Sequence, residues 1–222
     1  MDERFEQWLT GFLEGDGSVS FRYKRDNCGY LSLNPEVSFG QRNPEVLEYI
    51  KDKMGFGNMH KGGNSGMWYL KSFGQKRFLV FVEACRNWVV SEYYVSRFNA
   101  VITEMKRNFV LTCHKPTLDW FVGFWDAEGS SGNFRPSPLR PYIALQISVH
   151  NKNLDMISGV KDLMGVGSVQ PEAHDSFGWR VGPRASFSVA EVLLERSHNP
   201  QKRSKLVEHI QRARESRVEG KV

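Results

Sequence analysis

Two stretches of the chain share one pattern of apolar and small residues, and each ends in an acidic residue followed by glycine. The first is Leu9–Gly17 and the second is Phe121–Gly129. Small residues stand four positions apart in both, so they lie on one face of a helix and allow close packing there. The closing glycine is a typical helix terminator. The pattern predicts two motif helices, over residues 2–14 and 117–128. The small residues are Gly11 and Gly15 in the first helix and Gly123 and Ala127 in the second.

Alternating apolar and polar residues follow each motif helix and predict antiparallel strands. Strands are expected at residues 18–24, 31–39, 57–61 and 67–73 in the first half, and at 130–135 and 142–149 in the second. Apolar residues at helical spacing predict further helices at residues 45–54, 79–90, 93–106, 154–164, 189–195 and 202–214. Turns are expected at residues 26–29 and 63–66, and a stiff, proline-rich loop at 136–141.

The second half of the chain repeats the first. Met164–Gly167 corresponds to Met54–Gly57, an offset of 110 residues (164 − 54), and Trp179 corresponds to Trp68, an offset of 111 (179 − 68). A period this long indicates duplicated half-domains and argues against a solenoid. The predicted organisation is a first repeat over residues 1–107, a linker over 108–116 and a second repeat over 117–222.

Composition narrows the class of protein. Of the 222 residues, 40% are hydrophobic and 13% are aromatic, which is sufficient for a core. The net charge of +5 suits a polyanionic partner, although ordinary solubility explains it as well. The three cysteines are far apart and indicate neither a zinc site nor a disulfide framework.

The chain shows no membrane or secretion signal. Its longest apolar run, around residues 78–84, is too short to span a bilayer, and the N-terminus lacks a signal-peptide core. We therefore expect a soluble intracellular protein of a reducing compartment, with no membrane partner. The residues do not distinguish the cytoplasm from an organelle.

Asp16 and Glu128 occupy equivalent positions at the ends of the motif helices, 112 residues apart (128 − 16). If these helices pack side by side and parallel, the two carboxylates meet where both helix dipoles are negative, which a divalent cation would relieve. The alternative is a capping or solubilising role, for which lysine or asparagine would be the more natural choice. The pair therefore predicts a metal site. Oxygen ligands without cysteine or histidine nearby favour magnesium over zinc.

The two stretches resemble the signature helices of a LAGLIDADG homing endonuclease of the single-chain, two-repeat type. The resemblance implies an α+β fold of two pseudo-symmetric αββαββα half-domains, whose antiparallel sheets form a DNA-binding saddle, with the motif helices packed at the central interface. It implies a monomer that cuts a long, asymmetric double-stranded DNA site. Two or three Mg²⁺ ions, for which Mn²⁺ or Ca²⁺ would substitute, are then shared by Asp16 and Glu128, with the backbone carbonyls of Gly15 and Ala127 as further ligands.

The resemblance adds two more residues to the catalytic set of Asp16 and Glu128. Family members often carry a glutamine at the end of the second strand, matched by Gln41, and a basic residue at the start of the last helices, matched by Lys202. A solvated lysine at a helix start explains Lys202 equally well. In the second half, Val149 or His150 stands where the glutamine is expected. The first half has Ser91 and Glu92 where the basic residue is expected, so the two half-sites are expected to cut at different rates.

Glu14 and Asp126 precede the two acids by two residues and fall on another helix face. We expect them to be structural, as capping residues or as contacts to the opposite helix.

The outward sides of the predicted strands are rich in residues that bind base edges and phosphates, with few acids. A solvated sheet face would carry a similar set. The expected DNA contacts are Ser18, Ser20, Arg22, Lys24, Arg25, Ser32, Asn34, Glu36, Ser38, Arg42, Lys61, Tyr69, Lys71, Ser130, Asn133, Arg135, Arg140, Tyr142, Gln146, Ser148, His150, Arg180 and Arg184.

A different class of function remains open beside the nuclease. Proteins with the same fold also act as intron-splicing maturases or as non-cleaving nucleic-acid-binding proteins, and RNA would be a partner if this chain is also a maturase. Both acids are present here, which favours the endonuclease. A third alternative is a generic basic structural domain, but it would require the repeat to have arisen by chance.

Overall fold

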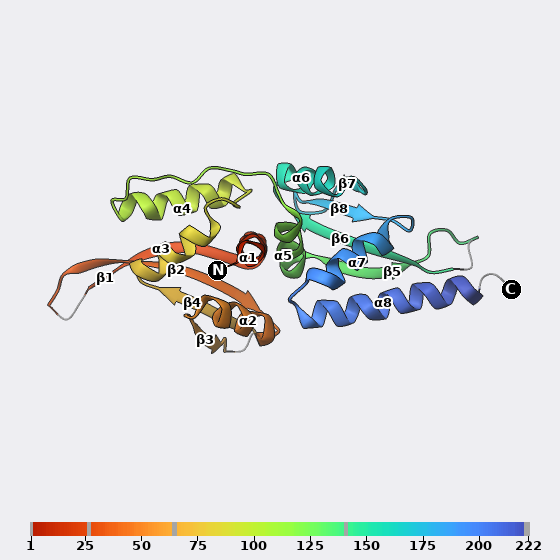
Figure 1. The fold of residues 1–222 in the computed structure, drawn as a ribbon, viewed down its shortest axis with the longest axis horizontal. Coiled ribbons are helices and arrows are strands. Elements are labelled where there is room, and N and C mark those ends of the chain that lie inside the picture. The colour runs from red at the N-terminus through yellow and green to blue at the C-terminus, as the bar shows by residue number, and fades with distance from the viewer. Residues whose placement is uncertain (1, 26–27, 64–65, 140–141, 220–222) are drawn as a thin grey trace. The chain divides into compact units, whose positions relative to one another are not determined.

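The computed structural model describes residues 2–25, 28–63, 66–139 and 142–219. The chain divides into two compact units, Met1–Phe124 and Trp125–Val222. The boundary falls inside helix α5 (Leu118–Glu128), so the first part of this helix belongs to the first unit. Each unit has the expected α+β class, with one four-stranded antiparallel sheet and helices (Figure 1). The repeat boundaries expected at residues 107 and 117 remain a prediction.

Both units place the same elements in the same order. The first contains α1 (Glu3–Asp16), β1 (Gly17–Arg25), β2 (Leu31–Gln41), α2 (Pro44–Met54), β3 (Asn58–Lys61), β4 (Trp68–Phe73), α3 (Gln75–Cys85) and α4 (Glu92–Glu104). The second begins in α5 and continues with β5 (Ser130–Phe134), β6 (Ala144–Asn151), α6 (Leu154–Met164), β7 (Ser168–Pro171), β8 (Phe177–Val181), α7 (Ser186–Arg196) and α8 (Pro200–Glu219). The sheet orders, β1-β2-β4-β3 and β5-β6-β8-β7, are equivalent. Each unit therefore follows the expected αββαββα order with one further closing helix.

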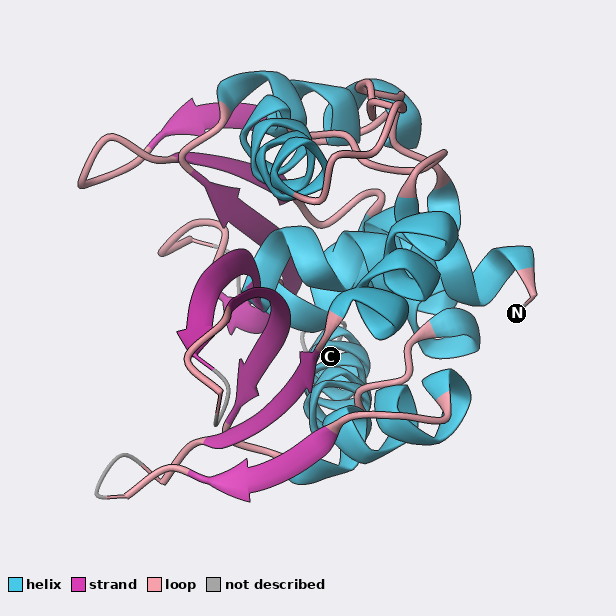
Figure 2. Ribbon diagram, turned by 90° about the vertical axis from the view of Figure 1, so that its left-hand side faces the viewer, coloured by secondary structure: helices cyan, strands magenta, loops and turns pink. Residues whose placement is uncertain are grey.

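Within each unit, helices lie against one face of the sheet and the strands present the other (Figure 2). In the first unit, Val19, Val37 and Leu70 point from the strands into the core and are almost completely buried. The apolar face of α1 is buried as well, including Trp8 and Phe12. The alternation along the strands therefore separates a helix-covered face from an outer face. No helix among the described residues is long and apolar enough to cross a lipid bilayer.

The ends of α2 and α6 confirm the repeat between Met54–Gly57 and Met164–Gly167. Gly55 and Gly165 close these helices in the left-handed region, with φ of 72° and 63°. Each donates its backbone N–H to the carbonyl of the lysine four residues earlier at 2.9 Å. Only glycine adopts this conformation without a steric penalty, so the pattern predicts both helix ends correctly.

Tertiary contacts correct several expected boundaries. The helix expected at residues 79–90 is α3, which begins at Gln75 and ends at Cys85. Trp179 corresponds in strand pairing to Leu70 and not to Trp68, because Trp179 pairs with Val149 as Leu70 pairs with Phe39. The strand expected at residues 142–149 is β6, which begins two residues later. Asp26–Asn27, Asn64–Ser65 and Arg140–Pro141, where turns and a loop are expected, lie outside the described residues.

Helix α1 and the first part of α5 meet backbone to backbone within the first unit. A Cβ atom added at Gly11 would lie 1.9 Å from the carbonyl oxygen of Trp120. A Cβ atom added at Gly123 would lie 1.9 Å from the carbonyl oxygen of Trp8. Real Cβ atoms do not approach so closely, so both positions require glycine. The two glycines predicted to lie on a close-packing face do so here.

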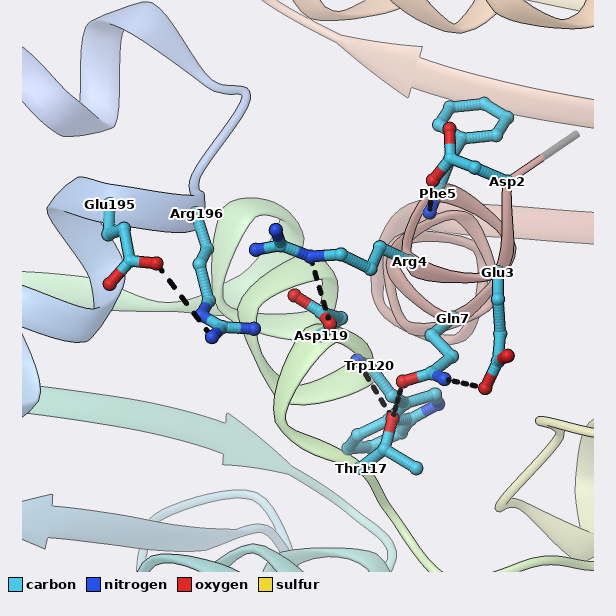
Figure 3. Close-up of polar contacts among 10 residues, drawn as sticks. All are labelled: Asp2, Glu3, Arg4, Phe5, Gln7, Thr117, Asp119, Trp120, Glu195 and Arg196. Atoms are coloured by element: carbon cyan, nitrogen blue, oxygen red, sulfur yellow. Dashed lines mark hydrogen bonds and ion pairs between the residues drawn. The ribbon is translucent and has the colours of Figure 1, made fainter.

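Polar side chains fasten the start of α5 to α1 (Figure 3). Thr117 donates its hydroxyl to Gln7 Oε1 at 2.6 Å, and its own Oγ1 accepts the backbone N–H of Trp120 at 3.3 Å. Arg4 forms an ion pair with Asp119, with 3.5 Å between Nε and Oδ2. Since Thr117 binds both helices, it sets where α5 begins relative to α1.

We predict that Gly11→Ala destabilises the protein by about 2 kcal/mol or more, because the new methyl group would overlap a backbone carbonyl. Helix propensity alone predicts the opposite sign, since alanine is favoured over glycine by about 1 kcal/mol in a helix. Urea unfolding of the variant measures the difference. Gly63→Ala is the control, because its Cβ meets no atom within 4 Å. A Gly11→Ala protein as stable as the wild type would contradict the helix contact.

Candidate active site and nucleic-acid interface

The acid of the first unit has a defined partner. Asp16 is the last residue of α1, and β1 begins directly after it. Gln41, the last residue of β2, donates its side-chain N–H to Asp16 Oδ2. A charge-assisted hydrogen bond of this kind holds a carboxylate in one orientation. The structure thus brings together two of the four residues expected to form the catalytic set.

The acid of the second unit ends α5, whose final carbonyls are bound by Lys202. Glu128 is the last residue of α5. Lys202 Nζ donates to the carbonyl oxygens of Trp125 and Ala127 at 2.8 and 2.6 Å. A cation at a helix C-terminus is favoured by the unsatisfied carbonyls and the helix dipole. Lys202 is therefore held beside the residue that precedes Glu128, and the Ala127 carbonyl expected to bind metal accepts a hydrogen bond from its ammonium group.

The first unit has a tyrosine where the second has Lys202. Lys202 follows Asn199, whose side chain accepts the Lys202 backbone N–H at 3.2 Å at the start of α8. Ser91 is the equivalent N-cap of α4, and Tyr94 is the third residue after it. The Tyr94 hydroxyl donates to the carbonyl oxygen of Gly17 at 2.6 Å. Tyr94 could not be predicted from the residues alone, because a neutral tyrosine does not match the basic residue expected near Ser91 and Glu92.

The counterpart of Gln41 in the second unit is Asn151. Ser18 pairs with Ser38, and Ser130 pairs with Ser148, so the second strands are offset by 110 residues (148 − 38). The expectation of Val149 or His150 at this position was wrong by one or two residues, because strand register is set by pairing and not by spacing alone. Asn151 Oδ1 accepts the backbone N–H of Asn153 at 2.9 Å.

Glu14 is structural, as expected from its position on another face of α1. Its side chain is 3% exposed and accepts backbone N–H groups of Val90 and Ser91, the latter at 2.6 Å. It also accepts the indole N–H of Trp120 in α5 at 2.6 Å, again within the first unit. Burial raises the pKa of Glu14 to about 7, and its hydrogen bonds to Ser91, Val90 and Trp120 offset this only in part. The acid thus fixes the turn that precedes Tyr94.

Asp126 has the same function in the second unit. It is fully buried and accepts the hydroxyl of Ser197 at 2.5 Å and the backbone N–H of His198 at 2.8 Å. Asn199 donates its side-chain N–H to the Asp126 backbone carbonyl at 3.0 Å. These contacts fix the turn that precedes Lys202. In both units, the acid two residues before the predicted metal ligand places the polar residue of the last helix.

Strand pairing puts most of the expected DNA contacts of the first unit on the outer face. Paired residues share a face, and the pairs here are Ser18–Ser38, Ser20–Glu36, Arg22–Asn34, Lys24–Ser32, Ser38–Lys71 and Gly40–Tyr69. Within this row, Lys71 Nζ lies 3.4 Å from Glu36 Oε1. The Arg22 guanidinium lies 5.1 Å from the centre of the Phe73 ring. The row is therefore polar, and its charged members are mainly basic.

Two expected contacts of the first unit lie elsewhere. Lys61 pairs with Trp68, which places it on the opposite face from the row, with its Nζ 5.8 Å from the centre of the Trp68 ring. Arg25 pairs with Leu31 at the end of the ladder and donates to the Gly29 carbonyl at 3.3 Å. Both depart from the row because side chains alternate between faces along a strand. Arg42 follows β2 and is exposed.

The second unit has a shorter outer row. Ser130, Gln146 and Ser148 lie on it, together with Arg180, which pairs with Ser148. Arg180 Nη2 donates to Glu172 Oε1 at 2.6 Å, and His150 Nε2 lies 3.7 Å from the same oxygen. A Cβ added at Gly178 would lie 2.6 Å from that oxygen and 2.7 Å from His150 Cδ2. Glycine therefore makes room for this cluster of charges.

Asn133 was expected to contact DNA, but it does not lie on the outer row of the second unit. It pairs with Leu145, on the face opposite to the outer row, and donates to the His209 carbonyl in α8 at 2.9 Å. Tyr142 lies before β6 and carries the Arg217 guanidinium 5.8 Å from its ring centre. Arg135 and Arg184 are exposed next to strand ends. Arg140 lies outside the described residues.

Comparison with known proteins agrees with this geometry. Residues 9–83 match the family model of the LAGLIDADG endonucleases. The chain is 26% identical over 189 residues to the intron-encoded RNA maturase bI4 of Saccharomyces cerevisiae, covering 84% of this chain and 28% of the relative. It is 23% identical over 198 residues to a probable intron-encoded endonuclease, Cox1-I1b, of Schizosaccharomyces pombe, covering 76% of this chain and 51% of that protein. The chain thus spans about a quarter to a half of the length of these relatives.

A solved structure extends the similarity to both units. The LAGLIDADG meganuclease I-AabMI bound to uncleaved DNA superimposes with a TM-score of 0.76 at 14% identity, over 96% of this chain and 92% of that one. Residues 9–83 therefore match the LAGLIDADG endonuclease model, and the chain has the fold of the LAGLIDADG meganuclease I-AabMI.

We predict that Glu14 makes stability depend on pH. Its pKa is raised from 4.5 to about 7 in the folded protein, so the folded state holds the proton more tightly. The stabilisation is fully present below pH 4.5 and is lost as the pH rises towards 7, by up to roughly 3 kcal/mol. Glu14→Gln cannot titrate. The free energy of unfolding of the wild type minus that of Glu14→Gln, from urea titrations, should fall between pH 4.5 and 7. Parallel pH curves for the two proteins would refute the assignment.

Proposed function

We propose that this protein is a site-specific, metal-dependent DNA endonuclease that cuts both strands of a long, asymmetric site. The observation that carries the proposal is the equivalent placement of two acids at the ends of two signature helices. Asp16 ends α1 with Gln41 bound to it, and Glu128 ends α5 beside the carbonyls that hold Lys202. The match of residues 9–83 to the family model and the fold support the same reaction class.

The donor chemistry suits magnesium. Among the described residues, no group of three or more histidine, cysteine, aspartate or glutamate side chains could hold a metal ion. Magnesium is commonly bound by only one or two carboxylates, with water and substrate phosphates completing its shell. Asp16 and Glu128 would be those carboxylates, and the carbonyls of Gly15 and Ala127 would add oxygen ligands, for two or three ions in all. When bound, such ions polarise a phosphate and activate water.

Two side chains of the protein assist the acids: one orients a carboxylate and the other supplies positive charge. Gln41 holds the Asp16 carboxylate in one orientation through its amide N–H. The Lys202 ammonium, fixed on two carbonyls of α5, supplies positive charge near Glu128, where a phosphodiester gains negative charge during cleavage. We infer that both residues act on the chemical step and contribute little to DNA affinity.

The outer strand faces would bind the DNA. We propose that the outer face of each sheet contacts the major groove, where base edges carry a full donor and acceptor code. Lys71 and Arg180 occupy equivalent ladder positions, opposite Ser38 and Ser148. They would contact phosphates and set the register, while serine, asparagine and glutamine side chains reach base edges. The protein would act as a monomer in a reducing intracellular compartment, in intron homing.

We predict that Asp16→Asn lowers cleavage by roughly 10²- to 10³-fold or more, because the amide cannot supply the charge that binds the metal. DNA binding should survive. A library of randomised duplexes incubated with Mg²⁺ identifies a cleaved target, and cleavage and gel-shift assays on that target then measure both quantities. Asp52→Asn, an exposed acid of α2, is the control and should cut normally. Full activity of Asp16→Asn would remove Asp16 from the mechanism.

We predict that Lys71→Ala weakens DNA binding and lowers the slope of log affinity against log salt concentration by about 1, because one phosphate contact is lost. Its partner Glu36 would also be left facing the DNA. Fluorescence anisotropy over a salt series measures the slope. Lys51→Ala, an exposed lysine of α2, serves as the control. An unchanged slope in Lys71→Ala would place the phosphate contacts on other residues.

A second function has one specific observation in its favour. The relative from Saccharomyces cerevisiae, which matches over 84% of this chain, is named an RNA maturase. The chain could then bind its own intron RNA, with or without DNA cleavage. Stable binding of that RNA without nicking of any duplex in the library would favour this second function.

A further inference from the structure

The last helices of the two units place different polar groups beside their acids. In the first, the Tyr94 hydroxyl donates to the Gly17 carbonyl, directly after Asp16, at 2.6 Å. In the second, the Lys202 ammonium donates to the Ala127 carbonyl, directly before Glu128, at 2.6 Å. Both side chains are third from the capping residue of the last helix of their unit, Ser91 or Asn199.

The same kind of support holds each residue in place. The turn before α4 is bound by the buried carboxylate of Glu14, and the turn before α8 is bound by that of Asp126. Tyr94 is 6% exposed, so its ring is packed and its hydroxyl reaches the Gly17 carbonyl from a fixed position. Tyr94 is therefore part of the architecture around Asp16 in the way that Lys202 is part of the architecture around Glu128.

The chemical capacity of the two groups differs. An ammonium group carries a full positive charge and three N–H donors, and Lys202 directs two of them to backbone carbonyls. A phenol is neutral at pH 7 and has one O–H donor, which Tyr94 gives to Gly17. Hydrogen bonds from a charged group are about twice as strong as neutral ones. Among the described residues, the last helix of the second unit therefore places an ammonium group next to its acid, whereas the last helix of the first unit places a neutral hydroxyl there.

We propose that Tyr94 is the positioning residue of the Asp16 site, and that its neutral hydroxyl, in place of the Lys202 ammonium, makes this site slower than the Glu128 site. The inference rests on the proposed function. The Tyr94 hydroxyl holds the chain where α1 passes into β1, and so helps to place the Asp16 carboxylate. It adds no positive charge to offset the charge of the reacting phosphate. DNA is then cut in two steps, with the strand attacked at the Glu128 site cut first.

The test follows each strand separately. A duplex recovered from the randomised library is labelled with a different fluorophore on each strand and incubated with wild-type protein and Mg²⁺. We expect a nicked intermediate carrying one label, with strand rates that differ by roughly fivefold to tenfold, as for a neutral donor in place of a charged one.

Variants then test whether Tyr94 determines the cleavage rate of the slow strand. Tyr94→Phe keeps the ring and loses the hydrogen bond, so the slow strand should slow further by about threefold to tenfold while the fast strand is unchanged. Tyr94→Lys should raise the slow strand towards the rate of the fast one. Lys202→Tyr should slow the fast strand to the rate of the other. Tyr93→Phe, at the exposed neighbouring position, is the control and should leave both rates unchanged.

The outcomes separate the inference from the proposed function. If no duplex is cleaved, the proposed function fails and this inference fails with it. If both strands are cut at equal rates by the wild type, the endonuclease stands and the inference is overturned. It is also overturned if Tyr94→Phe slows both strands equally and lowers the melting temperature, since that is the signature of a purely structural tyrosine.

Discussion

The backbone contact between α1 and the start of α5 is the constraint on which the first unit depends. At Gly11 and Gly123 each helix presses on a carbonyl of the other, at a separation that leaves no room for a side chain. The apolar residues around this contact, such as Trp8 and Phe12, are completely or almost completely buried. Because packed interiors deform little, this contact also fixes the positions of the helix ends, which lie several residues away.

In each unit, a buried acid connects the motif helix to the turn before the last helix. Glu14 joins α1, the turn before α4 and Trp120 of α5 through three hydrogen bonds. Asp126 joins α5 to the turn before α8. A buried carboxylate is unfavourable unless donors surround it, so each acid restricts its turn to one arrangement. The acids that support the site are thus as specific as the acids proposed to act in it.

The two units share a framework but differ at the positions that we propose to act in catalysis. The serine pairs Ser18–Ser38 and Ser130–Ser148 have almost identical hydrogen bonds, of 2.8 and 2.9 Å. Near the acids, Gln41 corresponds to Asn151 and Tyr94 corresponds to Lys202. A duplicated fold therefore keeps its hydrogen-bonded ladder while the side chains around each acid differ in length and charge. These differences are the basis of the proposed difference in cleavage rate between the two DNA strands.

Local pattern alone determined much of this protein. Neighbouring residues alone predict the signature helices, the repeat of Met54–Gly57 and the helix ends at glycine. Helix periodicity and left-handed glycine are local properties of the chain. Only tertiary structure decided the rest. Strand register identifies Asn151 as the counterpart of Gln41. Hydrogen bonds between residues far apart in the chain establish the correspondence of Tyr94 with Lys202, and the end of α3 also depends on tertiary contacts. Residue spacing does not encode these contacts, since they arise only when separate elements pack together.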